Sequence, residues 1–242
     1  MPDRERLARE QAALAELGGR VLAPQELGRI LQDAVELVAQ TLEVEHATVL
    51  ELSPDGDEVR LRAGVGWQER DVGHRVEAMP GGHVAYVLDA PEAVIVDDVA
   101  SETRFEASPL LVEQGIRASL GVSIPGTGSR PFGVLGVHTG GDKKFTDVDA
   151  QFLEGVANVL ASAIARHRRA IEMNDEILQT LVLAQYAVRR GSPDASALLE
   201  KAIGQTRAMI TRLLGSEGGT GTTLPGDLRR EAPPSISDDQ PG

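Results

Sequence analysis

The chain has 242 residues, 41% hydrophobic and 25% charged, which is enough for one globular domain of ordinary size and a smaller module. Its formal net charge of −13 disfavours binding to DNA, RNA or an anionic membrane surface, because these repel an acidic protein. The absence of cysteine excludes disulfides, thiolate nucleophiles, cysteine-ligated zinc, iron–sulfur clusters and a thioether-linked bilin.

Two helices are predicted at the start of the chain. The first, within residues 1–19, has apolar residues at helical spacing and is expected to end at Gly18-Gly19. The second runs from about Pro24 to Leu42 along a stripe of apolar residues spaced three and four apart. The charged N-terminus is unlike a signal peptide and no apolar run reaches the ~18–20 residues of a membrane span, so we expect a cytoplasmic protein.

Strand patterns follow these helices. Ala47–Leu52 and Val59–Ala63 flank a Ser-Pro-Asp-Gly-Asp turn and are predicted to form a β-hairpin. Gly81-Gly82 is expected to start a short helix that ends near Leu88, and Val94–Val96 is a short buried strand.

Three more elements complete this part of the chain. Leu110–Gln114 is predicted as a short helix that Gly115 stops. Ala118–Ile124 and Phe132–Thr139 are predicted strands, joined by a turn rich in proline and glycine.

A long helix is predicted from Thr146 to about Arg190. Thr146 is a good N-cap, and the acidic first turn suits the positive end of a helix. Spacings of three and four define the seam of a supercoiled helix: Ile164, His167, Ile171, Asn174, Leu178, Leu181, Gln185 and Val188.

A second C-terminal helix, from about Pro193 to Leu214, carries its own apolar stripe after the break at Gly191-Ser192-Pro193. The two helices are expected to form an antiparallel hairpin over residues 166–214. Because one hairpin cannot cover both stripes, we predict that two copies form a four-helix bundle and that the protein is a homodimer. Residues 215–242 are predicted to be a disordered tail.

Between about Pro24 and Ala165 the chain resembles the GAF family of sensor domains. Five phrases in the family's order carry the resemblance: residues 80–85, residues 94–98 followed by Arg104-Phe105, residues 115–125, residues 132–137, and residues 145–149. The resemblance implies an α+β fold over residues 20–165, with a central antiparallel sheet flanked by helices. It also implies a ligand pocket between one sheet face and the segment from about Trp67 to Leu111.

The candidate ligand-binding residues are polar or aromatic side chains in or near the implied pocket: Trp67, His74, Met79, His83, Tyr86, Arg104, Phe105, Ser119 and His138. Small-ligand sites are mostly apolar with few polar groups, as this set is. Two alternatives stay open. The large side chains would instead fill the core of a protein with few aromatics, and Arg104 would pair with Asp97 or Asp98.

The C-terminal hairpin resembles the dimerisation and phosphoacceptor helices of bacterial histidine kinases. Asp175 and Gln179 match that motif, but Asn174 stands where the family has the phosphoaccepting histidine. An amide nitrogen is not a nucleophile towards phosphoryl groups, and too few residues follow Leu214 for an ATP-binding domain, so we expect no kinase activity. The resemblance implies dimerisation, with a histidine kinase or response regulator as a partner.

Other chemistry is disfavoured by the residues present. No histidine pair has a metal-binding His-x-x-x-His spacing, and Ser123 lies inside a predicted strand rather than on a nucleophile elbow. Haem is disfavoured because residues 111–115 lack the axial histidine of the family's haem-binding members, although His83 and His138 keep it open. A cyclic nucleotide is disfavoured because residues 142–150 match its motif only in part.

We therefore expect a non-catalytic, dimeric, cytoplasmic regulator of bacterial signal transduction, which binds an unidentified small molecule and transmits through its C-terminal helices. Two alternatives remain. One is a ligand-free adaptor or decoy for a kinase or response regulator, which a filled core around Trp67 would favour. The other is an RNA binder, because residues 202–209 weakly resemble antiterminator modules.

Overall fold

The computed structural model describes residues 2–23, 25–68, 73, 75–77, 81–126, 128 and 130–215. The chain forms two compact units, Met1–Glu172 and Met173–Gly242. No helix in the described part of the chain has the length and apolar character needed to cross a membrane. In order, the elements are α1 (Pro2–Leu22), α2 (Leu27–Leu42), β1 (His46–Leu52), β2 (Glu58–Val65), β3 (Arg75–Glu77), α3 (His83–Asp89), β4 (Val94–Val96), α4 (Pro109–Glu113), β5 (Ala118–Ile124), β6 (Gly133–Thr139), α5 (Asp147–Arg189) and α6 (Ala195–Gly215).

The first unit is built on a six-stranded sheet in the order β3-β2-β1-β6-β5-β4, and every neighbouring pair is antiparallel. The central register places His46 opposite His138 and Gly121 opposite Gly136. This arrangement confirms the antiparallel α+β fold that the sequence predicts.

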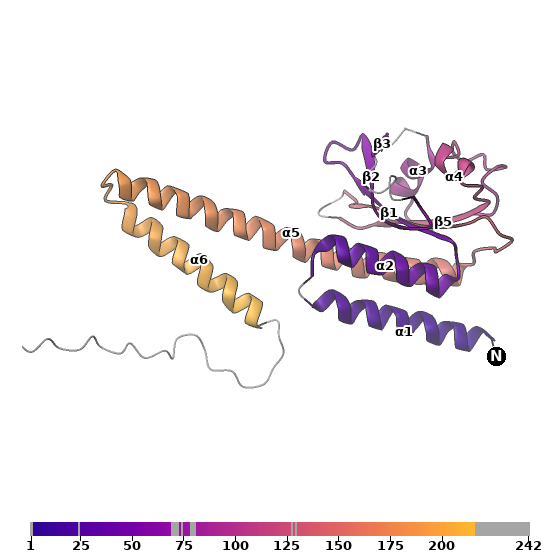
Figure 1. The fold of residues 1–242 in the computed structure, drawn as a ribbon, viewed down its shortest axis with the longest axis horizontal. Helices are drawn as coiled ribbons and strands as arrows, with labels where there is room; N and C mark the ends of the chain where they lie inside the picture. The colour runs from indigo at the N-terminus through magenta and orange to yellow at the C-terminus, as the bar shows by residue number, and fades with distance from the viewer. Residues whose placement is uncertain are drawn as a thin grey trace, which may run out of the picture. The chain divides into compact units, whose positions relative to one another are not determined.

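The two faces of the sheet are covered differently. One face packs against α2 and the first part of α5, with α1 packed on these helices farther from the sheet, and α3 and α4 cover the other face (Figure 1). The predicted stripe of α2 is buried in the first layer, where Leu31, Val35 and Val38 are inaccessible to solvent. The second layer is smaller, and it is the one that holds the cavity described below.

The start of α5 is fixed by a capping box. The backbone N–H and the hydroxyl of Thr146 donate to Asp149 Oδ2 at 2.7 and 2.8 Å, and the Asp149 N–H lies 3.4 Å from the Thr146 hydroxyl. Arg6 of α1 also binds Asp149. Burial alone would raise the pKa of the Asp149 carboxyl, but the hydrogen bonds from Arg6 and Thr146 outweigh that effect and hold it below its usual value.

The structure corrects the end of the first helix. The prediction that Gly18-Gly19 ends it is wrong, because α1 continues to Leu22. Two glycines cost a helix only ~1 kcal/mol each relative to alanine, and burial of Leu17 and Val21 against the core on either side of them outweighs this cost. The short strand β3 was not predicted, and α2 begins at Leu27 rather than near Pro24, which lies outside the described residues.

The second unit consists of the end of α5 together with α6. Their buried side chains are small or medium in size: Ile177, Thr180, Ala184, Ala187 and Ala202. The Gln205 amide of α6 donates to the Glu176 carboxylate of α5 at 2.7 Å. Exposed apolar side chains remain on both helices: Leu178, Leu181, Val182, Leu183, Tyr186, Val188, Leu199, Ile203 and Ile210.

The first residue of the predicted supercoil seam is buried, whereas the later apolar residues of the seam are exposed. Ile164 belongs to the buried core of the first unit, whereas Ile171, Leu178, Leu181 and Val188 are exposed apolar side chains. The hairpin and the dimeric bundle remain predictions. The predicted tail lies outside the described residues from 216 onward.

Candidate functional site

A cavity of about 280 Å³ lies between the sheet and the helices α3 and α4. The strands supply Thr48, Leu50, Leu61, Gly121, Val134, Gly136 and His138, and the covering segments supply Trp67, His83, Val84, Val87, Ser108, Leu110, Leu111 and Glu113. Most of these side chains are apolar. The cavity is therefore of the kind that holds a small organic molecule with few polar groups, and its volume is close to the lower end of the ~300–1,000 Å³ usual for such sites.

Two glycines form the floor of this cavity. Gly121 of β5 and Gly136 of β6 are direct cross-strand partners. A Cβ at Gly136 would lie 3.0 Å from the Thr48 hydroxyl and 3.1 Å from His138 Nε2, and a Cβ at Gly121 would lie 3.1 Å from a methyl group of Val87. The open space depends on the absence of side chains at these two positions.

Both ring nitrogens of His138, on β6, lie within hydrogen-bond distance of a hydroxyl group. Its Nδ1 is 3.0 Å from the hydroxyl of Ser119, and its Nε2 is 3.4 Å from the hydroxyl of Thr48. Ser119 is inaccessible to solvent and His138 is buried. Burial lowers the pKa of His138 to about 3, so its imidazole is neutral at physiological pH.

Trp67 closes one side of the cavity. Its indole N–H donates to the Ala47 carbonyl at 3.1 Å, which fixes the ring beside β1. The ring centroid lies 5.9 Å from that of His138 and 5.2 Å from that of His46, in edge-to-face geometry in both cases. Gly64 gives the indole room, because a Cβ there would lie 2.8 Å from the ring.

His83 begins α3 and forms another wall. Its ring stacks on Phe105, with centroids 4.6 Å apart and planes 11° from parallel. Its Nε2 is buried and has no hydrogen-bond partner among the described residues. Burial lowers the pKa of His83 to about 4, which also makes this imidazole neutral at physiological pH.

Tyr86 and Arg104 lie behind this wall rather than in the cavity. Arg104 forms a salt bridge with Glu102 at 2.6 Å and donates to the Ile95 carbonyl at 2.7 Å. It also lies over the rings of Tyr86 and Phe105, at 5.7 and 5.8 Å from their centroids. The expected alternative pairing of Arg104 with Asp97 or Asp98 is wrong, since Glu102 is the carboxylate that it binds.

The predicted site residues therefore fall into several groups. Trp67, His83 and His138 line the cavity, while Phe105 and Ser119 support its two histidines. His74 and Met79 lie outside the described residues. Asn174, Asp175 and Gln179 are exposed on α5, and none of them lines the cavity.

The candidates chosen from the sequence did not include the two glycines of the cavity floor or the threonine beside them. Gly121, Gly136 and Thr48 were not among the candidates. The alternation of strands β1 and β6 would have found Thr48, because it places Thr48 and Leu50 on one face and Val134, Gly136 and His138 on the facing positions of the next strand.

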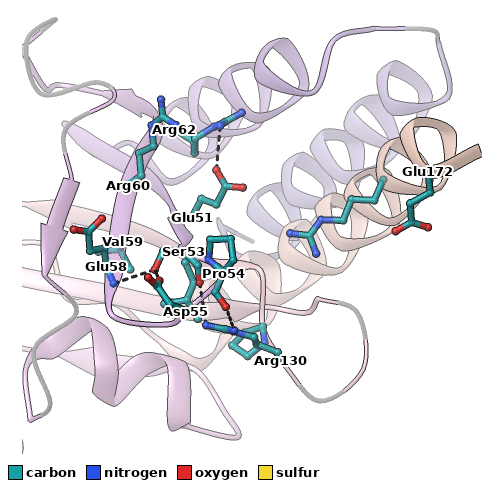
Figure 2. Close-up of a pocket in the computed structure, with 13 residues that line it drawn as sticks. Glu51, Ser53, Pro54, Asp55, Glu58, Val59, Arg60, Arg62, Arg130 and Glu172 are labelled. Atoms are coloured by element: carbon teal, nitrogen blue, oxygen red, sulfur yellow. Dashed lines mark hydrogen bonds and ion pairs between the residues drawn. The ribbon is translucent and has the colours of Figure 1, made fainter. Parts of the chain in front are cut away.

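A second hollow, of about 700 Å³, is polar and open (Figure 2). Arg130 donates to the carbonyls of Ser53 (2.9 Å) and Pro54, and Arg62 pairs with Glu51 at 3.0 Å. Its arginines (Arg60, Arg62, Arg130 and Arg168) are matched in number by its carboxylates (Glu51, Asp55, Glu58 and Glu172). The described lining of this hollow therefore has no excess of either charge. In the described ranges no cluster of histidine and carboxylate residues is arranged to hold a metal ion.

The GAF domain family model matches residues 26–164 of the chain. A curated relative, the Nif-specific regulatory protein of Bradyrhizobium diazoefficiens, is 28% identical over 237 aligned positions, which cover 88% of this chain and 40% of the relative. The chain thus spans less than half the length of that relative.

Solved structures of low sequence identity share the fold. The GAF domain of a phosphoenolpyruvate-protein phosphotransferase from Coxiella burnetii superposes with a TM-score of 0.60 at 21% identity, over 67% of this chain and 96% of that one. The free methionine-R-sulfoxide reductase from Neisseria meningitidis, in complex with its substrate, gives 0.56 at 18% identity, over 66% and 91%. These likenesses concern the fold alone.

Proposed function

The chain belongs to the GAF domain family, and from that premise we propose that it is a non-catalytic, homodimeric regulator of bacterial signal transduction. It binds a small molecule in the cavity beside Trp67 and passes the binding state along α5 and α6 to a partner protein. One observation carries this proposal: an apolar cavity lies beside the second core of the domain, over a floor of two paired glycines.

This cavity favours the sensor function over the adaptor alternative. An adaptor that binds no ligand gains nothing from an apolar hollow beside its core, because apolar surface that stays unburied adds nothing to stability. The cavity of about 280 Å³ lies where the adaptor hypothesis expects packed side chains, between Trp67 and α3. The space is therefore better explained by a ligand.

Contacts within the first unit link the cavity to α5. Glu154 of α5 accepts a hydrogen bond of 3.2 Å from the Ala93 N–H, next to β4. Arg168 of α5 lies over the ring of Phe132, which precedes the cavity-lining strand β6, at 5.5 Å from its centroid. A ligand that shifts β4 or β6 would act on α5 at both places. Transmission further requires that the ligand bind two arrangements of α5 with different affinity.

The C-terminal helices supply the dimer interface in this proposal. Leu178 and Leu181 are exposed on α5, and Ile203 and Ile210 are exposed on α6. A second copy that buries these side chains removes them from water, as in a four-helix bundle. The resemblance of this segment to kinase dimerisation helices favours a histidine kinase or response regulator in the cytoplasm as the partner, with Asn174 preventing phosphorylation of the regulator itself.

The first experiment is native followed by denaturing mass spectrometry of the purified full chain, with an absorption spectrum alongside. We expect a dimer that carries extra mass, lost on denaturation, or a dimer that takes up a small molecule from a screened mixture. A dimer that binds nothing would return the adaptor alternative to first place.

A variant pair tests the interface. Leu178→Glu with Leu181→Glu places charges on the exposed face of α5 and is expected to give monomers. Leu22→Glu, at an apolar position on α1 that is more exposed still, is the control and should leave the dimer intact. A wild-type monomer, or a dimer that survives the double substitution, would contradict this interface.

A further inference from the structure

We infer that Asn174 and Gln185 lie inside the interface between two copies of the chain, as two polar layers on either side of an apolar centre, and that these layers fix how the copies align. This inference rests on the proposed function, because it concerns the interface that the proposed dimer uses. The packing of α5 against α6, and the positions of the exposed residues around each helix, carry it.

The second unit shows how its two helices are aligned. Buried or half-buried side chains of α5 correspond one to one, in reverse order, to those of α6: Met173, Ile177, Thr180, Ala184 and Ala187 on α5, and Met209, Gln205, Ala202, Leu198 and Ala195 on α6. The hydrogen bond between Gln205 and Glu176 falls in the same register. Two helices that pack side by side in opposite directions produce this correspondence, and Figure 1 shows α6 returning along α5.

Each helix also carries an exposed stripe at helical spacing. The stripe consists of Asn174, Leu178, Leu181, Gln185 and Val188 on α5, and of Leu199, Ile203, Thr206 and Ile210 on α6. At about 100° per residue, each exposed stripe is centred about a quarter turn from the buried stripe, in the same sense of rotation on both helices. Because the helices run in opposite directions, this places both exposed stripes on one side of the helix pair, which we call the bundle face.

A second copy of the chain complements the bundle face. When two such faces meet about a two-fold axis parallel to the helices, α5 of each copy lies against α6 of the other. The register of the helix pair then brings together exposed residues of like polarity: Leu178 with Ile203, Leu181 with Leu199, Asn174 with Thr206, and Gln185 with Ser196. Apolar side chains therefore meet apolar ones in the centre, and polar side chains meet polar ones on either side.

The two polar layers exclude other alignments of the copies. A shift of one copy by a helical turn would place Asn174 opposite Ile203 or Ile210, where its amide would be buried without a hydrogen-bond partner. In the inferred alignment the amide and the hydroxyl of Thr206 can each donate and accept. A polar residue within an apolar seam specifies register in this way, at a cost in stability.

The cost in stability gives the first test, on the full-length protein. Asn174→Leu and Gln185→Leu each replace a polar layer with apolar side chains from both copies, so each should lower the dimer dissociation constant at least about tenfold. Gln179→Leu makes the same chemical change at an exposed position of α5 outside the bundle face, and it should leave the dissociation constant unchanged. Sedimentation equilibrium measures the constant for each variant.

Disulfide cross-linking tests the alignment itself, since the chain has no cysteine of its own. A preparation of Leu178→Cys is mixed with one of Ile203→Cys, left to exchange subunits and oxidised, so that a bond between the two positions can form only between copies. We expect disulfide-linked heterodimers in this mixture. A mixture of Leu178→Cys with Leu181→Cys should give few, because these positions would meet only if α5 lay against α5 of the second copy in the opposite direction.

The outcomes separate this inference from the proposed function. A dimer whose dissociation constant is unchanged or raised in Asn174→Leu would place Asn174 outside the interface, and it would overturn the inference while the dimeric regulator stands. Preferred cross-linking of position 178 to position 181 would overturn the inferred alignment in the same way. A wild-type chain that is monomeric would remove both the inference and the dimer on which the proposed function depends.

Discussion

Acidification from pH 8 to pH 5 should destabilise the first unit, because His83 and His138 are buried there as neutral imidazoles. Burial lowers their pKa values to about 4 and about 3, whereas an unfolded histidine has a pKa of about 6.5. The unfolded chain therefore binds protons in this range that the folded protein does not. The stability that the two neutral imidazoles contribute is fully present above pH 6.5, and it is lost as the pH falls towards their pKa values in the folded protein.

The size of the loss follows from the pKa difference. Each pH unit between the unfolded and folded pKa values costs about 1.4 kcal/mol per group, so at pH 5 each of the two histidines costs about 2 kcal/mol. The sum of about 4 kcal/mol is large against the 5–15 kcal/mol stability typical of a domain. Burial also lowers the pKa of His46, which adds to the loss in the same direction.

Urea unfolding at several pH values, followed by Trp67 emission, measures this effect in the first unit alone. The range stops at pH 5 because carboxylates such as Asp149, whose pKa is lowered, begin to contribute below it. His83→Phe and His138→Gln should each remove about half of the pH-dependent loss, and Tyr86→Phe, which removes no imidazole, should retain it. A flat profile in the wild type, or the wild-type slope in His138→Gln, would refute the assignment of these histidines as buried and neutral.

Two further substitutions test the cavity floor and the start of α5. Gly136→Ala places a methyl group 3.0 Å from the Thr48 hydroxyl and 3.1 Å from His138 Nε2, and this overpacking should cost about 1–3 kcal/mol in urea unfolding. Gly28→Ala, on α2 with open space around its Cβ, should lose no stability; equal effects of the two substitutions would show that the cavity floor has room for a side chain. Asp149→Ala removes the capping box and the salt bridge to α1, and it should lower the free energy of unfolding in urea by about 2 kcal/mol. Arg9→Ala, which breaks an exposed surface pair, is the control and should cost less than about 0.5 kcal/mol. Similar losses for the two variants would contradict the role of Asp149.

The sequence by itself determined the order and type of most elements. Alternating apolar residues in Ala118–Ile124 and the turn residues that follow mark a strand and its return, and the stripe of α2 marks a helix buried on one side. These patterns are local, because a side chain's direction repeats every two residues in a strand and every 3.6 in a helix. The phrases that resemble the family were likewise enough to identify the fold over residues 26–164.

Only the tertiary structure decided which candidates meet. Trp67, His83 and His138 come from three separate parts of the chain, and the sheet register together with the packing of α3 brings them around one cavity. Arg104 was a candidate of the same kind, yet it pairs with Glu102 outside that cavity.

The cavity itself has no sequence signature, since it is space left where residues from several elements do not touch. Two glycines in adjacent strands create its floor only because the register pairs Gly121 with Gly136. The continuation of α1 past Gly18-Gly19 has the same kind of cause, because burial of Leu17 and Val21 against the core outweighs the local preference to stop. Local periodicity is written in the chain, whereas voids and long-range burial exist only once distant segments have packed together.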